Sequence, residues 1–114
     1  MSDAFLPSEK EKRLIGALGM SARARKMIFG VPMICDALAG QKKAGKYPLV
    51  VFESADTSEN THKRISDRCG YYGVRLVRLE IDGATLAAAL GKSASLAAVA
   101  LTDENLARLA ESYL

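Results

Sequence analysis

The sequence predicts an α/β fold, a three-layer α-β-α sandwich built on a four-stranded mixed sheet. Segments with helical periodicity alternate with short apolar segments in the order α-β-α-β-α-β-α-β-α. This alternation is typical of a parallel or mixed sheet between helices. The run Leu49-Val50-Val51-Phe52 is continuously apolar, as in a strand covered on both faces. The 114 residues suit one domain with its own core, and no internal repeat or linker divides them.

The first elements are predicted from local signals. Residues 1–7 are expected to form a loose leader, and residues 8–114 a single domain. Ser8 is the expected N-cap of the first helix. The apolar stripe of this helix has helical spacing and consists of Leu14, Ile15, Leu18 and Ala22. A brief strand at Met27–Phe29 ends at Gly30, and Pro32 suits the first turn of a second helix that ends near Gly40.

A basic loop at residues 41–47 leads to the buried strand, predicted over Pro48–Ser54. We expect Asp56 to cap the third helix, with Glu59 three residues later as an acidic capping box, and Gly73 to end it. The buried face of this helix follows the helical period and is formed by His62, Ile65, Cys69 and Tyr72.

The last third of the chain predicts two strands and two helices. A strand over Val74–Leu79 is followed by Asp82-Gly83, which leads into a short alanine-rich helix that stops at Gly91. The last strand is predicted over Leu96–Leu101. Thr102 or Asp103 then caps a terminal helix that runs to about Leu109 or beyond.

Positive charge is concentrated in the first part of the chain. The net charge is +3, but nine basic and four acidic residues give +5 through Pro48, and the remainder carries −2. Such asymmetry fits a surface that faces a polyanion. We expect a cytoplasmic protein. No signal-peptide pattern is present, and the apolar run of residues 84–101 does not predict a membrane span because Gly91-Lys92-Ser93 interrupts it. Cys35 and Cys69 suit reduced thiols.

The sequence does not favour an enzyme. It contains no zinc-binding spacing, no nucleophile elbow and no phosphate-binding P-loop, and no carboxylate pair stands out as acid and base. The glycines Gly16 and Gly19 lie inside the first helix rather than after a strand. The single histidine, His62, is expected to be a packed or partly exposed core residue. We therefore expect no catalytic residue, no cofactor and no metal.

Two segments are candidates for a phosphate or nucleic-acid site. The first is the strand-to-helix junction at Gly30, where the N–H groups of Val31 and Met33 face outwards from the start of the helix. Just upstream, Arg23, Arg25 and Lys26 are placed to contact phosphates. The alternative is that Gly30 makes an ordinary tight turn and that the cations form a solvated face.

The second candidate is the loop Gly91-Lys92-Ser93-Ala94-Ser95, whose small side chains, hydroxyls and single cation suit close approach to a nucleic-acid backbone. The alternative is a surface loop after a glycine C-cap. Three tyrosines are further candidates for base stacking: Tyr71, expected to be half-exposed, Tyr72, better interpreted as core, and Tyr47.

Several segments together resemble a known family. Leu14–Lys26, Gly30, Leu49–Thr61, Leu90–Lys92 and Ala98–Asp103 stand in the order and spacing of the ribosomal protein superfamily of L-seven-Ae, L-thirty-e and Gadd-type proteins. The chain looks most similar to the bacterial YlxQ-like branch of RNA-binding proteins. The resemblance implies the L-thirty-e-like α-β-α fold and a non-enzymatic RNA binder, many of whose relatives recognise kink-turns.

Carried over by the resemblance, the RNA-binding surface consists of two segments: Gly30, Val31, Pro32, Met33 and Asp36, and Lys92, Ser93, Ala94, Ser95 and Leu96. Kink-turn readers of this family usually have an amide and a carboxylate or amide where this chain has Pro32 and Met33, and a lysine where it has Asp36. Pro32 has no N–H, Met33 has no strong acceptor, and Asp36 repels phosphate. We therefore expect weakened kink-turn recognition.

The leading hypothesis is a protein that binds structured RNA, either ribosomal RNA or a transcript, within a ribonucleoprotein. A second hypothesis is a protein-interaction module in which the apolar stretch Val31–Ile34 docks a ribosomal or transcription-related partner. A third is an accessory RNA-binding domain of an RNA-modifying enzyme, whose catalytic part would have to be another polypeptide. No membrane partner is expected.

Overall fold

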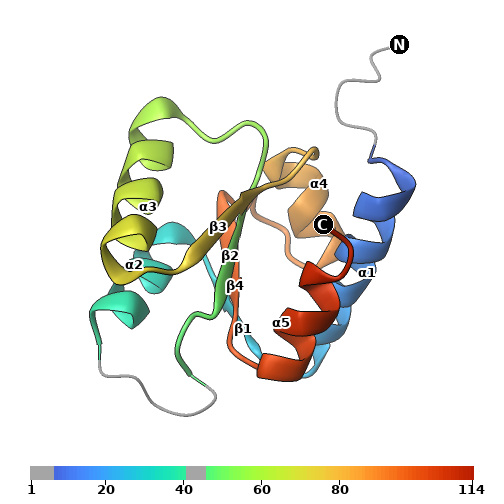
Figure 1. Cartoon of the computed structure of the whole chain (residues 1–114). Coiled ribbons are helices and arrows are strands. Elements are labelled where there is room, and N and C mark those ends of the chain that lie inside the picture. The colour runs from blue at the N-terminus through green and yellow to red at the C-terminus, as the bar shows by residue number, and fades with distance from the viewer. Residues whose placement is uncertain (1–6, 41–45) are drawn as a thin grey trace.

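The computed structural model describes residues 7–40 and 46–114. Residues 1–6 of the predicted leader and residues 41–45 of the predicted basic loop lie outside this part. The elements follow the predicted order (Figure 1): α1 (Glu9–Arg23), β1 (Met27–Phe29), α2 (Val31–Ala39), β2 (Val50–Glu53), α3 (Glu59–Tyr72), β3 (Arg75–Arg78), α4 (Gly83–Ala89), β4 (Ala98–Leu101) and α5 (Glu104–Glu111).

The four strands form one mixed sheet, as predicted, in the order β1-β4-β2-β3. β4 pairs antiparallel with β1 and with β2, whereas β2 and β3 are parallel. Phe29 and Phe52 both lie opposite Val99. The short strand β1 pairs with β4 alone and is therefore an edge strand of the sheet. The β2, β3 and β4 strands are shorter than predicted, because the predicted ranges included flanking loop residues such as Pro48.

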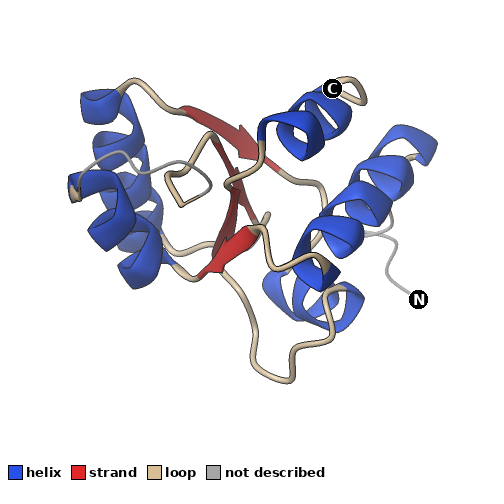
Figure 2. Cartoon of the chain, turned by 90° about the horizontal axis from the view of Figure 1, so that it is seen from below, coloured by secondary structure: helices blue, strands red, loops and turns tan. Residues whose placement is uncertain are grey.

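Helices cover both faces of the sheet, which confirms the predicted three layers (Figure 2). The α1, α4 and α5 helices pack on one face, against Val50 and Phe52 of β2. The α2 and α3 helices pack on the other, against Val51 of the same strand. All three side chains are fully buried. Successive residues of a strand point to opposite faces, so a continuously apolar strand is what two covered faces require.

Several predicted helix ends are confirmed. The Ser8 hydroxyl accepts a hydrogen bond from the Glu11 N–H at 3.2 Å, which caps α1. Of the two residues offered as the cap of α5, Asp103 is the cap, and its carboxylate accepts the Leu106 N–H. Asp82, which the sequence placed only before the helix, caps α4 in the same way by accepting the Thr85 N–H. Gly73 ends α3 in the left-handed conformation, at φ 68°.

The predicted cap of α3 is wrong. The N-cap is Ser58, whose hydroxyl accepts the Thr61 N–H at 3.2 Å, and the helix begins at Glu59. Asp56 lies two residues earlier, in the turn after β2, and its carboxylate accepts the Gly83 N–H at 2.8 Å instead. A contact across 27 residues thus replaces the local cap, and local spacing alone does not reveal such a contact.

Candidate functional site

The Gly30 corner lies where β1 ends and α2 begins. Gly30 has φ 88°, a conformation that favours glycine, and its N–H donates to the Ala98 carbonyl of β4 at 2.9 Å. Helix geometry leaves the N–H groups of Val31 and Met33 without an intrahelical acceptor, and Gly30 has no side chain to accept them. The backbone geometry predicted for this corner is therefore present.

The side chains at the start of α2 divide into two sets. The Val31 side chain is buried in the core between α2 and the sheet, so only its backbone is available to a ligand. Pro32, Met33 and Asp36 are exposed, and 60% of the Met33 surface is accessible. The outward surface of this helix start is thus apolar with one acidic group.

The predicted cations gather beside the corner, on the α1 side of the sheet. Arg23, Arg25 and Lys92 line one hollow of about 350 Å³. The Lys92 ammonium lies 4.3 Å from the centre of the Phe29 ring, a distance within the range of cation–π attraction. Lys26 is not among the residues that line this hollow. The structure therefore brings three of the four predicted phosphate-contacting cations together.

The loop between α4 and β4 lies next to the corner, because it leads directly into Ala98. Ser93, Ala94 and Ser95 are exposed and Leu96 is half-buried. The Leu96 N–H donates to the Gly83 carbonyl at 3.1 Å. A Cβ at Gly83 would clash with the Ser95 hydroxyl and lie 2.6 Å from the Leu96 carbonyl oxygen. The loop is thus held against the start of α4.

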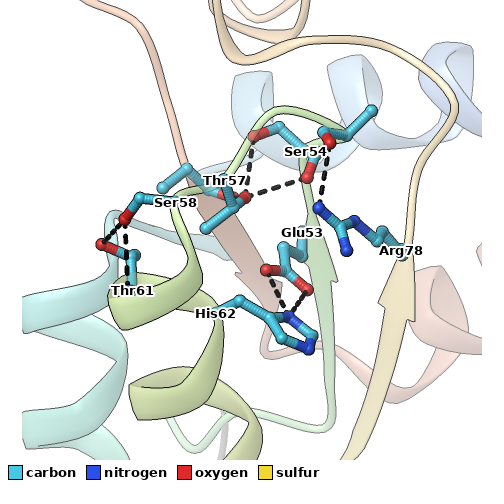
Figure 3. A network of polar contacts seen from close by, with 9 residues as sticks. Glu53, Ser54, Thr57, Ser58, Thr61, His62 and Arg78 are labelled. Carbon is cyan, nitrogen blue, oxygen red and sulfur yellow. Dashed lines mark hydrogen bonds and ion pairs between the residues drawn. The ribbon is translucent and has the colours of Figure 1, made fainter.

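A polar network that the sequence did not predict lies at the same end of the sheet (Figure 3). Glu53 is fully buried at the end of β2, and both its carboxylate oxygens lie 2.8 Å from Nδ1 of His62 in α3. Thr57 donates to the Ser54 carbonyl at 2.9 Å. In the sequence, this network is indicated only by the cluster of hydroxyl residues directly after the buried strand. His62 is partly exposed, as expected.

This network borders a polar cleft. The cleft has a volume of about 190 Å³ and includes Thr57 and Ser58 on one side and Ser95 of the α4–β4 loop on the other. Hydrogen bonds from the side chain and N–H of Thr85 lower the pKa of Asp82, the cap of the neighbouring α4. The cleft and the Gly30 corner share the end of the sheet where β1 and β2 finish.

Only one of the three candidate tyrosines has a largely exposed ring, and it lies away from the Gly30 corner. Tyr47 is buried and its hydroxyl donates to the Leu38 carbonyl at 3.3 Å, so the structure contradicts a stacking role for it. Tyr72 is half-buried, as expected. Tyr71 is 82% exposed, more than predicted, and meets Tyr72 edge to face with ring centres 4.8 Å apart. It lies at the far end of α3 from the corner.

Both cysteines are buried and free. Burial raises the pKa of the Cys69 thiol to about 11. Within residues 7–40 and 46–114, no group of three or more potential ligand side chains is arranged to hold a metal ion. None of the helices described there is long and apolar enough to cross a membrane.

Comparison with known proteins supplies a relative and two similar folds. No family model matches the chain. The RNA-binding protein YlxQ of Bacillus subtilis is 32% identical over 97 residues, which cover 85% of this chain and 90% of that protein. A protein of unknown function from Bacillus halodurans has a TM-score of 0.76 at 23% identity, covering 89% of this chain and 95% of the other. The Giardia lamblia 15.5kD RNA-binding protein has a TM-score of 0.72 at 14% identity, covering 99% and 93%.

Proposed function

We propose, because the chain belongs to the family of the RNA-binding protein YlxQ, that it binds structured RNA and catalyses no reaction. The observation that carries this proposal is the grouping of Arg23, Arg25 and Lys92 around one hollow beside the Gly30 corner. RNA phosphates would meet these cations. The N–H groups of Val31 and Met33 and the loop at 93–96 would contact the adjoining nucleotides.

The proposed recognition differs from standard kink-turn binding. In the resembling family, polar side chains at the start of this helix read the RNA, whereas Pro32, Met33 and Asp36 stand exposed here. A good polar contact to a base contributes about 1–3 kcal/mol. Two lost contacts therefore weaken binding by roughly 30-fold to 20,000-fold. We infer that the RNA partner is a structured RNA other than a standard kink-turn, with ribosomal RNA and transcripts as the first candidates.

Titration of purified protein with structured RNA at several salt concentrations tests RNA binding. Three or four phosphate contacts predict that affinity falls roughly 20-fold to 150-fold between 50 and 200 mM salt. Affinity that does not change with salt, or no binding at low salt, would contradict the proposal.

The variant Asp36→Lys tests the inferred loss of kink-turn recognition. We expect it to bind a standard kink-turn more tightly than the wild type does, because an exposed anion is replaced by a cation that can meet phosphate. Asp67→Lys is the matched control, since Asp67 is exposed in the C-terminal half of α3 and the change in charge is the same. Equal gains in the two variants would show a bulk charge effect, and tight kink-turn binding by the wild type would refute the inference.

A second candidate function is docking of a protein to the start of α2. The exposed, apolar Met33 and Pro32 favour it, since apolar side chains grouped on a surface mark interaction sites. A ribosomal or transcription-related protein is the proposed partner. In a pull-down with this protein, the partner should still be captured after nuclease treatment and should be lost with the variant Met33→Glu. Loss of the partner on nuclease treatment would favour the RNA function alone.

A further inference from the structure

The hollow beside β1 has features beyond a patch of surface charge. Its floor includes Met27 and Phe29, which project to the same side of the edge strand and pack against the α1 side of the core. Leu90, at the end of α4, adds a third apolar wall residue. A ligand in this hollow would therefore meet apolar surface as well as cations.

The charge of the hollow is not neutralised within the described part of the chain. No aspartate or glutamate lines it. Among the described residues, ion pairs join Lys12 to Glu9 and Arg75 to Glu111, and the Glu53 carboxylate contacts the His62 ring. None of them involves Arg23, Arg25 or Lys92. Three cations around one concavity without a counter-charge attract an anion.

Two of the three cations stand at points where the chain turns at the end of a helix. Lys92 is held over the Phe29 ring, and it follows Gly91, whose φ of 74° turns the chain at the end of α4. Arg25 has φ 59°, the only positive value at a non-glycine residue in the described chain. The Lys26 N–H donates to the Ser21 carbonyl at 2.9 Å and the Arg25 N–H to the Ala22 carbonyl at 3.1 Å, so Arg25 is the left-handed residue that ends α1. The ends of α1 and α4 thus bring Arg25 and Lys92 to the same hollow.

We propose that this hollow seats one unpaired nucleotide of the bound RNA. Its phosphate lies among Arg23, Arg25 and Lys92, and its sugar and base lie against Met27, Phe29 and Leu90. The volume of about 350 Å³ is in the range of small-ligand sites and exceeds the needs of a phosphate alone. The inference rests on the proposed RNA function and adds to it a nucleotide site on the α1 face of the sheet edge.

Amide NMR spectra of the full chain test the position of this site. The probes are a single-stranded RNA pentamer, a nucleoside 5′-monophosphate and inorganic phosphate. We expect the pentamer to shift the amide signals of residues 23–29 and 90–92, and to do so at lower concentration than either small probe. Pentamer binding with shifts confined to residues 30–36 and 93–96 would overturn the nucleotide site while leaving the RNA function intact.

Two further outcomes separate the proposals. If the mononucleotide shifts residues 23–29 at lower concentration than the pentamer does, the site serves a free nucleotide and the RNA assignment is wrong. If neither the pentamer nor a structured RNA binds at low salt, the RNA function fails, and the nucleotide site fails with it.

Charge-matched variants test the same site by affinity. Arg23→Gln and Arg25→Gln should each weaken RNA binding roughly fivefold at 0.1 M salt and flatten its salt dependence by about one phosphate contact. Arg13→Gln is the control, since Arg13 is exposed on α1 about 15 Å along the helix from Arg23. Equal losses in all three variants would show bulk charge rather than a site and overturn the inference.

Discussion

Gly83→Ala should destabilise the protein, although alanine normally stabilises a helix. An added methyl in open space at a helical glycine contributes about 0.5–1 kcal/mol of stability. At Gly83 the new Cβ would clash with the Ser95 hydroxyl and lie 2.6 Å from the Leu96 carbonyl oxygen. Overpacking of this kind costs about 1–3 kcal/mol, so a net loss of roughly 1–2 kcal/mol is expected. Urea denaturation followed by circular dichroism measures it.

Gly16→Ala is the matched control for this change. Gly16 lies within α1, and a Cβ there has no atom within 4 Å, so this variant should gain about 0.5–1 kcal/mol. Gly83→Ala should also weaken RNA binding under conditions where the variant is fully folded, because the loop at 93–96 must move. Equal stabilisation of both variants would refute the close approach of the loop to α4.

Three further predictions follow from single residues. Arg25→Gly should leave the free energy of unfolding unchanged or raise it by up to about 1 kcal/mol, because glycine adopts the left-handed conformation of Arg25 more readily, whereas RNA affinity should fall. Denaturation and RNA titration measure the two effects. A parallel loss of stability and of RNA affinity would mean that Arg25 is structural. Cys69, with a thiol pKa of about 11, should be about one part in a thousand thiolate at pH 8, and should react with Ellman's reagent only on unfolding. The pKa of Asp82 is lowered in the folded protein, so its carboxylate contributes stability above the ordinary pKa of 3.8, and this contribution is lost as the pH falls through the folded pKa. Asp82→Asn should therefore reduce the loss of stability at acid pH. An unchanged loss at acid pH would count against a stabilising role of this carboxylate.

The features that could be predicted from the sequence are those that depend on neighbouring residues. Ser8 caps a helix by bonding three residues ahead, and Gly73 ends one by its own backbone freedom. Gly30 likewise turns the chain at the predicted junction. The apolar run at Leu49–Phe52 indicated two covered faces because a strand buried on both sides has no polar alternation.

The features that could not be predicted depend on contacts between distant segments. Asp56 has the local spacing of a cap, but its carboxylate bonds to Gly83 instead. Glu53 is buried because α3 folds back over the end of β2 and brings His62 to it. Arg25 and Lys92 were separate candidates in the sequence, and only the antiparallel pairing of β1 with β4 brings their segments together around one hollow.

Mapping of crosslinks between this protein and RNA in cells tests whether the Gly30 corner and its hollow bind RNA. The protein is irradiated in cells, the crosslinked RNA is recovered, and the modified peptides are identified by mass spectrometry. We expect crosslinks within residues 23–36 and 91–96, which form the Gly30 corner, the hollow and the adjoining loop. Crosslinks confined to the outer surface of α3, or recovery of no RNA above the background of an unrelated protein, would contradict this expectation.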